Sequence, residues 1–420
     1  MSEQRTYFCI DMKCFFASVE CAERGLNPFE TNLVVADESR GTNALCLAIS
    51  PAMKAKGVKN RCRISDIPKS ISYLVAKPRM RKYIEYAADI YDIYLDYISP
   101  EDIHVYSIDE AFLDVTKYLP LYQKEAKEFA KFLMNQIASR AHIPAAVGIG
   151  TNLYLAKVAL DITAKKNKDH IGVLTEETYR ETLGHHRPIT DFWQVSSGTA
   201  NRLARFGVYD MAGVASLPES TLYRAFGINA ELLIDHAYGR ECCEISDIKA
   251  YTPKSKSISN SQILFEDYTA EKALLVLTEM ALAGCEEMMR RKVICSKISI
   301  GVAYSKEIIP ASHGSIKLSR ATSLFSLVKP EMERLFQRIT VRNTPIRRLA
   351  ISFDDLSSDD CEGYDLFTDF AKVEQERALE RTVLSIKDRY GKSAVFRGMD
   401  LQEGATALAR NKMIGGHNSE

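Results

Sequence analysis

The alternation of hydrophobic and polar positions over the first 164 residues predicts an α+β domain. Short runs rich in β-branched and aromatic residues predict strands, and apolar residues at helical spacing predict helices. The strands are expected at 6–12, 31–36, 43–49, 103–108, 111–115 and 145–150. The helices are expected at 14–24, 80–97, 122–140 and 152–164. Strands interleaved with helices in this order favour a sheet covered by helices.

The remainder of the chain predicts two further modules and a tail. Glycines interrupt short helical pieces over 175–240, which indicates a small all-helical module. A β-α-β-β-α-β pattern follows, with strands at 257–265, 294–304, 314–322 and 346–353 and helices at 270–291 and 329–340. The two modules are joined by a stretch without strong periodicity, which we expect to be a linker. A helix-like segment at 371–390 lies near the end of the sequence.

Composition and charge refine this picture. The chain has 420 residues, of which 46% are hydrophobic and 26% charged, so we expect a multidomain globular protein rather than a disordered or fibrous one. The 55 basic residues balance the 55 acidic ones, but residues 249–348 are rich in Lys and Arg, whereas Asp dominates 354–369. A basic module beside an acidic tail can indicate a nucleic-acid surface.

Location is indicated by what the sequence does not contain. Charged residues interrupt the first 13 positions, and no uncharged apolar run approaches the roughly 18 residues that a membrane span needs. The ten cysteines form no Cys-x-x-Cys pair and are expected to be reduced thiols. We therefore expect a cytoplasmic protein with no membrane partner.

Three acids stand at the ends of predicted central strands. Asp11 ends the first strand, and Asp109 and Glu110 lie between two strands in an otherwise apolar segment. A tight turn at 108–111 could bring all three together, and clustered carboxylates are the oxygen ligands that Mg²⁺ accepts. Two such ions would suit in-line displacement at phosphorus. The alternative is that Asp109 and Glu110 are solvated turn acids and that Asp11 caps the next helix.

Cations and aromatic residues accompany these acids in the sequence. Lys54 opens a basic segment, and Lys157 lies on the helix after the 145–150 strand; together they could neutralise a triphosphate. Taken singly, either lysine could equally be a solvated surface charge. Phe15 and Phe16 follow the first strand as core aromatics, unless one of them forms the floor of a sugar pocket.

Four segments resemble the signature blocks of Y-family DNA polymerases, in order and spacing, and the match is closest to the UmuC-like branch of these translesion enzymes. The segments are CIDMKCFFASVE, AISPAMKAKGV, VYSIDEAFLDVT and VGIGTNLYLAKVALD. The resemblance implies a right-hand architecture with a palm, small fingers, a helical thumb and a β-α-β-β-α-β little finger. The implied ranges are palm at 1–30 and 76–170, fingers at 31–75, thumb at 171–240, linker at 241–252, little finger at 253–352 and acidic tail at 353–420.

The resemblance also implies roles for the acids. Asp11 and Asp109 would bind both Mg²⁺ ions, and Glu110 would complete the site at the ion that activates the primer 3′-hydroxyl. The main-chain carbonyl of Met12 would be a further ligand. These four residues form the implied catalytic and metal site.

The implied nucleotide site contains Phe15, Phe16, Ser50, Lys54 and Lys157. Phe16 falls at the steric-gate position, where a flat ring excludes a 2′-hydroxyl, and the two lysines match positions that hold the triphosphate. Ser50 stands near a tyrosine position of many relatives, so that tyrosine contact is lost or replaced. Lys54 replaces an Arg of many relatives, which exchanges a bidentate fork for a point charge.

The resemblance further implies partners and a physiological role. Leu366 and Phe367 resemble the short Leu-Phe peptides that dock on the sliding clamp, although the same residues could pack on their own domain. The implied activity is template-directed, low-fidelity insertion of deoxynucleotides opposite damaged bases, as in SOS-type damage tolerance, near the nucleoid. Primer-template DNA is the expected partner, and a recombinase filament or accessory subunit is a further one. Two rival classes are a cyclase-type palm enzyme and a non-catalytic DNA-binding or clamp-binding descendant.

Overall fold

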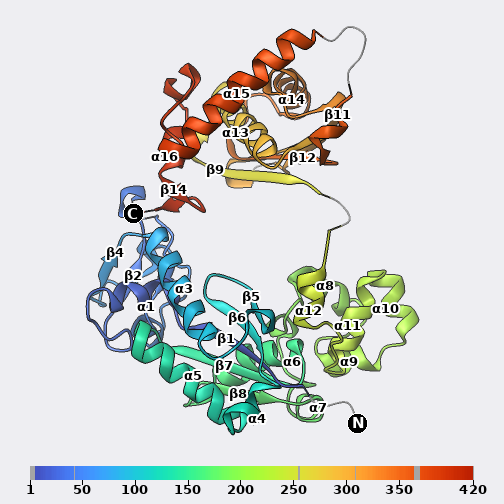
Figure 1. Ribbon diagram of the computed structural model, residues 1–420. Helices are drawn as coiled ribbons and strands as arrows, with labels where there is room; N and C mark the ends of the chain where they lie inside the picture. Colours follow the sequence, from blue (N-terminus) through green and yellow to red (C-terminus); the bar gives the residue numbers. More distant parts are fainter. Residues whose placement is uncertain (1–4, 42, 254–255, 308, 364–368, 420) are drawn as a thin grey trace. The chain divides into compact units, whose positions relative to one another are not determined.

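The computed structural model describes residues 5–41, 43–253, 256–307, 309–363 and 369–419 (Figure 1). The chain divides into two compact units, Met1–Tyr251 with Ser419–Glu420, and Thr252–Asn418. Within the described ranges, none of the helices combines the length and apolarity that crossing a bilayer requires.

The first unit is built on a five-stranded sheet in the order β5-β6-β1-β7-β8. Its strands are β1 (Tyr7–Met12), β5 (Ile103–Val105), β6 (Glu110–Asp114), β7 (Ala145–Gly150) and β8 (Ile171–Leu174). The central strand β1 runs antiparallel to both β6 and β7. Side chains alternate along it, so that Phe8 and Ile10 enter the larger core while Cys9 faces a second, smaller core.

Helices cover both faces of this sheet. The larger core lies beneath α1 (Phe15–Ala22), α3 (Met80–Leu95) and α5 (Ala126–Ala141). The smaller core lies beneath α6 (Leu153–Val158), which continues as a π-helical turn over Ala159–Ala164. A short helix α4 (Tyr118–Tyr122) follows β6. The helix-covered sheet expected from the sequence is therefore confirmed.

A small sheet forms the region predicted to be the fingers. Its order is β3-β2-β4, with β2 (Leu33–Val35) antiparallel to β3 (Ala48–Ile49) and parallel to β4 (Leu74–Ala76). Helix α2 (Pro51–Ala55) follows β3. The strands expected at 31–36 and 43–49 are present as the antiparallel pair β2 and β3, although both are shorter than expected, and β4 was not anticipated.

Short helices pack around a separate core after the sheet. They are α7 (Glu176–Leu183), α8 (Ser197–Ala204), α9 (Met211–Ser216), α10 (Glu219–Phe226) and α11 (Asn229–Ala237). Ser196 caps α8 by accepting a hydrogen bond from the Thr199 N–H at 3.3 Å. This module matches the short helical pieces expected over 175–240.

Two boundaries differ from the expected ones. Strand β8 pairs with β7 in parallel, so residues 171–174 belong to the five-stranded sheet and not to the helical module. The expected linker at 241–252 contains a helix, α12 (Ile245–Ala250), because Ile245 is buried in the smaller core with Phe112. The Lys249 ammonium also donates to the main-chain carbonyl of Pro100. Most of the predicted linker is therefore packed on the first unit, and the division between the two units lies at its end, between Tyr251 and Thr252.

The second unit confirms the β-α-β-β-α-β pattern. Its elements are β9 (Ile258–Tyr268), α13 (Ala270–Arg290), β10 (Val293–Tyr304), β11 (Ser312–Thr322), α14 (Phe325–Ile339) and β12 (Ile346–Asp354). The sheet order is β11-β10-β12-β9 with antiparallel pairing throughout. Inward-facing residues such as Ile298 and Ile351 pack beneath α13 and α14, and among the described residues of this unit no helix covers the other face of the sheet (Figure 1).

The segment expected to be an acidic tail is part of this second unit. It contains β13 (Ser357–Ser358), α15 (Phe370–Tyr390), α16 (Ala407–Asn411), β14 (Met413–Ile414) and β15 (His417–Asn418). Buried Glu279 of α13 accepts hydrogen bonds from the Thr406 N–H at 2.9 Å and the Ala407 N–H at 3.1 Å. The terminal helix is confirmed, but a tail separate from the little finger is wrong. Leu366 and Phe367, predicted to bind the clamp, lie outside the described residues.

Candidate active site

The three predicted acids meet at one end of the central sheet. Asp11 on β1 lies directly opposite Glu110 on β6, and the Met12 N–H donates to the Asp109 carbonyl at 2.9 Å. Side chains directly opposite each other on antiparallel strands share a face of the sheet. The Tyr106 and Ser107 N–H groups both bond the Glu110 carbonyl, at 2.9 and 3.0 Å. This turn ends β5 earlier than expected and brings residues about 100 positions apart together.

The clustering of the three acids changes the pKa of Asp11. Burial, together with the charges of Asp109 and Glu110, raises the pKa of Asp11 to about 7. Only part of this effect is offset by the positive charge of Lys157. The strand end is therefore a place where negative charge is costly and where a cation would be stabilised.

Glu110 is paired with Lys157, which is a buried lysine on α6. The Lys157 Nζ lies 2.7 Å from Glu110 Oε1, 2.9 Å from Oε2 and 3.1 Å from Asp161 Oδ2. Burial alone would lower the pKa of Lys157, but the surrounding negative groups, including Glu110 and Asp161, raise it. The Cys9 thiol donates to Glu110 Oε1 at 3.0 Å. The structure thus places a charged ammonium directly beside the acid cluster.

Glycines in β7 allow α6 to carry that lysine close to the sheet. A Cβ at Gly148 would lie 2.0 Å from the Ala156 carbonyl oxygen, and one at Gly150 would lie 2.2 Å from the Ala156 nitrogen. Asn152 caps the helix by accepting a hydrogen bond from the Leu155 N–H at 2.8 Å. The two glycines of β7 and the cap at Asn152 therefore hold α6 close to the sheet, which sets how far Lys157 lies from β1.

Phe15 and Phe16 have different environments. The chain turns from β1 into α1 through Cys14, whose φ is 52°. Phe15 is buried in the larger core. Phe16 is half-buried, and its ring stacks on Tyr83 of α3 with a centroid distance of 4.5 Å and an interplanar angle of 20°. Of the two rings, Phe16 therefore has the exposure that contact with a nucleotide sugar requires.

Ser50 and Lys54 lie on α2, at its beginning and end. The Ser50 hydroxyl is fully buried, donates to the Thr31 carbonyl at 2.7 Å and accepts from the Leu33 N–H at 3.1 Å. It also caps α2 by accepting a hydrogen bond from the Met53 N–H at 3.3 Å, so its local hydrogen bonds hold the beginning of this helix, and its contact with a nucleotide stays a prediction. Lys54, in contrast, is exposed.

Lys13 is a further cation that the sequence reading did not single out. Its Nζ lies 3.0 and 3.2 Å from the two ring nitrogens of His170. Burial, together with the positive charge of Lys54, lowers the pKa of Lys13. Its position two residues after Asp11 could have indicated a cation near the acid cluster. A lysine that follows a strand, however, usually lies on the solvated surface.

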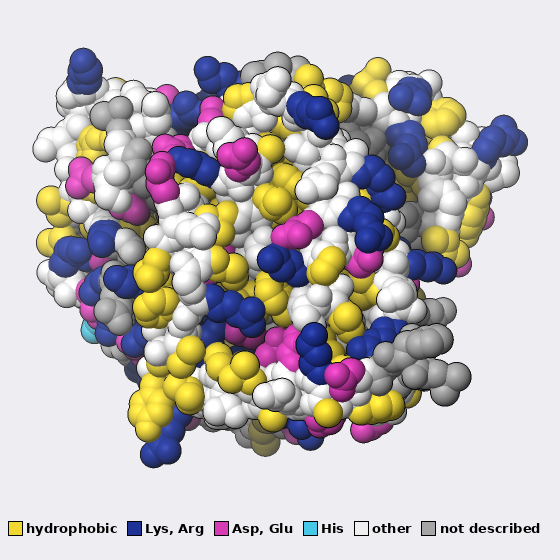
Figure 2. Space-filling view, turned by 90° about the horizontal axis from the view of Figure 1, so that it is seen from above, with side chains coloured by type: hydrophobic (Ala, Val, Ile, Leu, Met, Phe, Trp, Pro, Cys, Tyr) yellow, Lys and Arg dark blue, Asp and Glu magenta, His cyan; other side chains and the backbone are white. Residues whose placement is uncertain are grey.

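The uncovered face of the second sheet is polar, hollowed and partly basic. Small residues from all four strands line the hollow: Ser259, Ser261, Ser299, Gly301, Gly314, Ser315, Ala350 and Ser352. Lys297 lies directly opposite Lys317 on the neighbouring strand, and Arg348 lies on the same face. Like charges directly opposite each other destabilise a sheet, and Lys297 lies opposite Asp354 of β12 on its other side, so within these pairs only Lys297 has an acid opposite it. On the face of the molecule that Figure 2 shows, Lys and Arg side chains are mixed with Asp and Glu side chains.

The fold has a clear counterpart among solved structures. A Y-family DNA polymerase chimera of Dbh and Dpo4 matches 83% of this chain and 98% of its own, with a TM-score of 0.65 and 20% sequence identity. The architecture is that of the Y-family DNA polymerases.

Sequence comparison leads to the particular family. The model of the impB/mucB/samB family matches residues 10–161, and that of the same family's C-terminal domain matches residues 255–366. The chain is 30% identical to the putative UV-damage repair protein UvrX of Bacillus subtilis, over 99% of this chain and 98% of that protein. It is 31% identical to DNA polymerase IV 2 of the same organism, over 99% and 100%. The chain belongs to the impB/mucB/samB family.

Proposed function

We propose that the protein is a template-directed DNA polymerase of low fidelity that inserts deoxynucleotides opposite damaged bases. The observation that carries this proposal is the meeting of Asp11, Asp109 and Glu110 at one strand end, beside the Lys157 ammonium. The relatives named as a DNA polymerase and as a UV-damage repair protein support it. The enzyme is a DNA-directed DNA polymerase of the two-metal type.

Divalent cations fit the donor set at the strand end. As the side chains stand, the described ranges contain no group of three His, Cys, Asp or Glu residues already arranged around a metal position. The chemistry nevertheless suits Mg²⁺, because Asp11, Asp109 and Glu110 offer hard oxygen atoms, and burial together with the two neighbouring acids raises the pKa of Asp11. These residues, with the Met12 carbonyl, would hold two ions. When bound, the ions supply charge for the triphosphate and activation of the primer 3′-hydroxyl.

The chain's own groups bind and orient the nucleotide. Lys157 and exposed Lys54 bind the triphosphate as point charges, and Lys13 adds a third cation beside them. Phe16 lies against the sugar and excludes a 2′-hydroxyl by its bulk. The substrate is therefore a deoxynucleoside triphosphate, placed between cations and a flat ring.

Primer-template DNA binds through its phosphates to the uncovered face of the second unit. The small residues of that face let a backbone approach closely, and Lys297, Lys317 and Arg348 supply positive charge. We expect binding to be indifferent to sequence and sensitive to salt.

Lys317→Ala tests this surface. The exposed lysine should contribute to one phosphate contact, so its loss should weaken binding several-fold on every sequence and reduce the slope of log K against log salt by about 1. Fluorescence anisotropy of a labelled primer-template at several salt concentrations measures both effects. Lys329→Ala removes a half-buried lysine on α14, on the other side of the sheet, where it pairs with Glu333 at 3.6 Å, and should leave the slope unchanged. An unchanged slope in Lys317→Ala would contradict the interface.

The proposal extends to the cellular context. Leu366 and Phe367 dock on the sliding clamp, and a recombinase filament or accessory subunit assists synthesis across lesions. The protein acts in the cytoplasm, associated with the nucleoid. These statements are supported by the resemblance of the sequence to the family.

A primer-extension assay tests the activity and separates the three classes. A polymerase requires primer, template and Mg²⁺ and adds the base that the template dictates. A cyclase would convert nucleotide alone, and a non-catalytic descendant would bind DNA without extending the primer. Extension that ignores the template, or none with Mg²⁺ or Mn²⁺, would overturn the proposal.

A further inference from the structure

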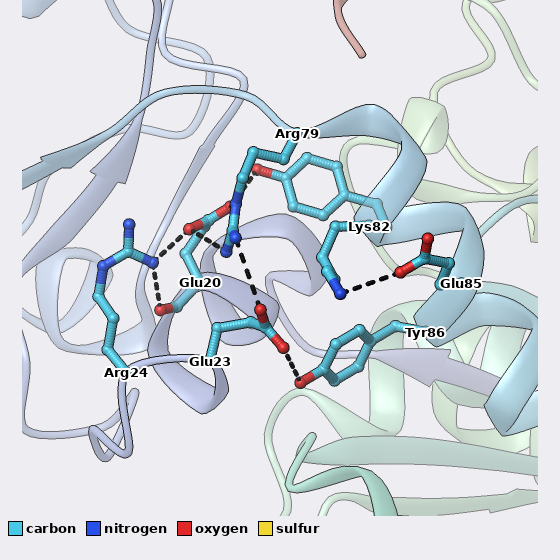
Figure 3. A network of polar contacts seen from close by, with 8 residues as sticks. Glu20, Glu23, Arg24, Arg79, Lys82, Glu85 and Tyr86 are labelled. Atoms are coloured by element: carbon cyan, nitrogen blue, oxygen red, sulfur yellow. Dashed lines mark hydrogen bonds and ion pairs between the residues drawn. The ribbon is translucent and has the colours of Figure 1, made fainter. Parts of the chain in front are cut away.

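A fully buried carboxylate lies behind the proposed sugar gate. Glu20 of α1 is 0% exposed, which is unusual for a glutamate. It stands four residues after Phe16 on the same helix, so the two side chains lie on one face, one turn apart. Figure 3 shows the polar contacts that converge on Glu20 from α1 and from the beginning of α3.

Two arginines and a tyrosine satisfy this carboxylate. Arg79 donates from Nε to Glu20 Oε1 at 3.0 Å and from Nη2 to Oε2 at 2.9 Å, which is a bidentate pair (Figure 3). Arg24 contacts the same carboxylate, and the Tyr83 hydroxyl donates to Oε1 at 2.9 Å. Burial would raise the pKa of Glu20, but the hydrogen bonds from Arg79, Arg24 and Tyr83 lower it. The carboxylate is therefore ionised and fixed in direction.

Tyr83 connects this ion pair to the gate. Its hydroxyl is held by Glu20, while its ring stacks on the Phe16 ring. Arg79 and Tyr83 are four residues apart at the start of α3, just as Phe16 and Glu20 are on α1. The four side chains are thus connected in a row: the Tyr83 phenol joins the stacked rings to the ion pair, and Arg24 and Glu23 contact that ion pair from α1 and its C-terminal end.

We propose that Glu20 and Arg79 are positioning residues for sugar selection, which act by fixing Tyr83 and, through it, the plane of Phe16. This inference rests on the proposed function, because Phe16 is the proposed gate. Stacked rings can slide past one another, and the hydrogen bond at the far end of Tyr83 removes that freedom. A buried ion pair is weak evidence for stability compared with apolar residues of similar volume, whereas its bidentate geometry specifies one arrangement.

Tyr83→Phe is the primary test. It keeps the stacking ring and leaves Glu20 with both arginines, so the variant should fold. We expect the ratio of kcat/KM for a deoxynucleotide to that for the matching ribonucleotide to fall about tenfold, because a hydrogen bond to a charged group is lost. Tyr86→Phe is the control: its hydroxyl donates to Glu23 at 2.9 Å, and Glu23 contacts Arg79 at a longer 3.5 Å, so loss of this phenol leaves both the bidentate Glu20–Arg79 pair and Tyr83 in place and should leave the ratio unchanged.

A double-mutant cycle separates positioning from a general structural effect. In a Phe16→Ala background, Tyr83→Phe should cause no further loss of discrimination, because it acts through the missing ring. An equal loss in both backgrounds would overturn the inference. So would a Tyr83→Phe variant with wild-type discrimination when Phe16→Ala alone lowers it. If Phe16→Ala itself has no effect on discrimination, the proposed gate fails instead.

Glu20→Gln provides a second measurement. An amide presents only one acceptor oxygen to the Arg79 fork, so we expect a loss of discrimination at least as large as that of Tyr83→Phe. Thermal unfolding of the variant shows whether it remains folded. A folded Glu20→Gln protein that discriminates as the wild type does would also overturn the inference.

Discussion

Replacing Asp109 with alanine will abolish primer extension and leave the fold intact. Asp109 is half-exposed, and the side-chain contact described for it is a hydrogen bond from the Ser107 hydroxyl two residues away. Its removal therefore leaves no buried partner unsatisfied. Because it is one of the two proposed ligands shared by both metal ions, we expect the rate of extension to fall by about a thousandfold or more, equivalent to roughly 4 kcal/mol of activation free energy.

This variant is a cleaner test than one at Glu110. Truncating Glu110 would leave the buried Lys157 ammonium without its main partner, and breaking such a pair typically costs about 3–5 kcal/mol of folding free energy. A loss of activity in a Glu110 variant could therefore come either from the missing metal ligand or from lower folding stability. Asp109→Ala should bind primer-template and unfold at the wild-type temperature, as measured by anisotropy and calorimetry.

Asp114→Asn is the control for removing an acid from the same strand. Asp114 ends β6 and pairs with Arg5 at 3.0 Å, away from the strand end that holds the cluster. We expect this variant to extend primers normally. If Asp109→Ala extended primers at the wild-type rate, the metal assignment would be refuted.

The second large effect is expected from Phe16→Ala. Without the ring, the space beside the sugar should accept a 2′-hydroxyl, so discrimination against ribonucleotides should fall by about 100-fold, within the range that steric selection by one pocket can supply. Incorporation of deoxynucleotides should change much less. Single-nucleotide insertion kinetics with a matched pair of triphosphates measure the ratio.

The neighbouring ring provides the comparison. Phe15 is buried in the larger core and its ring lies 5.8 Å from that of Phe16, so Phe15→Leu should lower stability and should affect sugar discrimination far less than Phe16→Ala does. A Phe16→Ala protein that still rejects ribonucleotides as well as the wild type would remove the gate from this position.

Much of the fold could be predicted because long elements carry a clear period. The strands β10 and β12 alternate buried and partly exposed residues over most of their length, and the sequence placed both to within a residue or two. The strands β4 and β8 are only three and four residues long. Each is defined by the strand it pairs with, which the local sequence does not reveal. For α12, the missing information was the burial of Ile245 against a distant core.

The site divides in the same way. Asp11, Asp109 and Glu110 could be found because acids interrupt apolar strands, and their spacing resembles a family motif. Glu20 could not, because a glutamate at helical spacing has the pattern of a solvated residue. Its burial depends on Arg79 and Tyr83, which lie about 60 positions later in the chain. Ser50 was predicted to contact the nucleotide because of its position in a family motif. The burial of its hydroxyl could be recognised only from the three-dimensional packing.

The strand β7 makes the enzyme vulnerable at positions remote from any substrate. Gly148 and Gly150 have only a hydrogen atom where α6 presses against them, so even a methyl group there would collide with main-chain atoms of the helix. The helix would have to rise, and the ammonium that it carries would rise with it. An alanine at Gly148 or Gly150 is therefore expected to displace the Lys157 ammonium from the acid cluster and to lower polymerase activity, although no catalytic side chain has been changed.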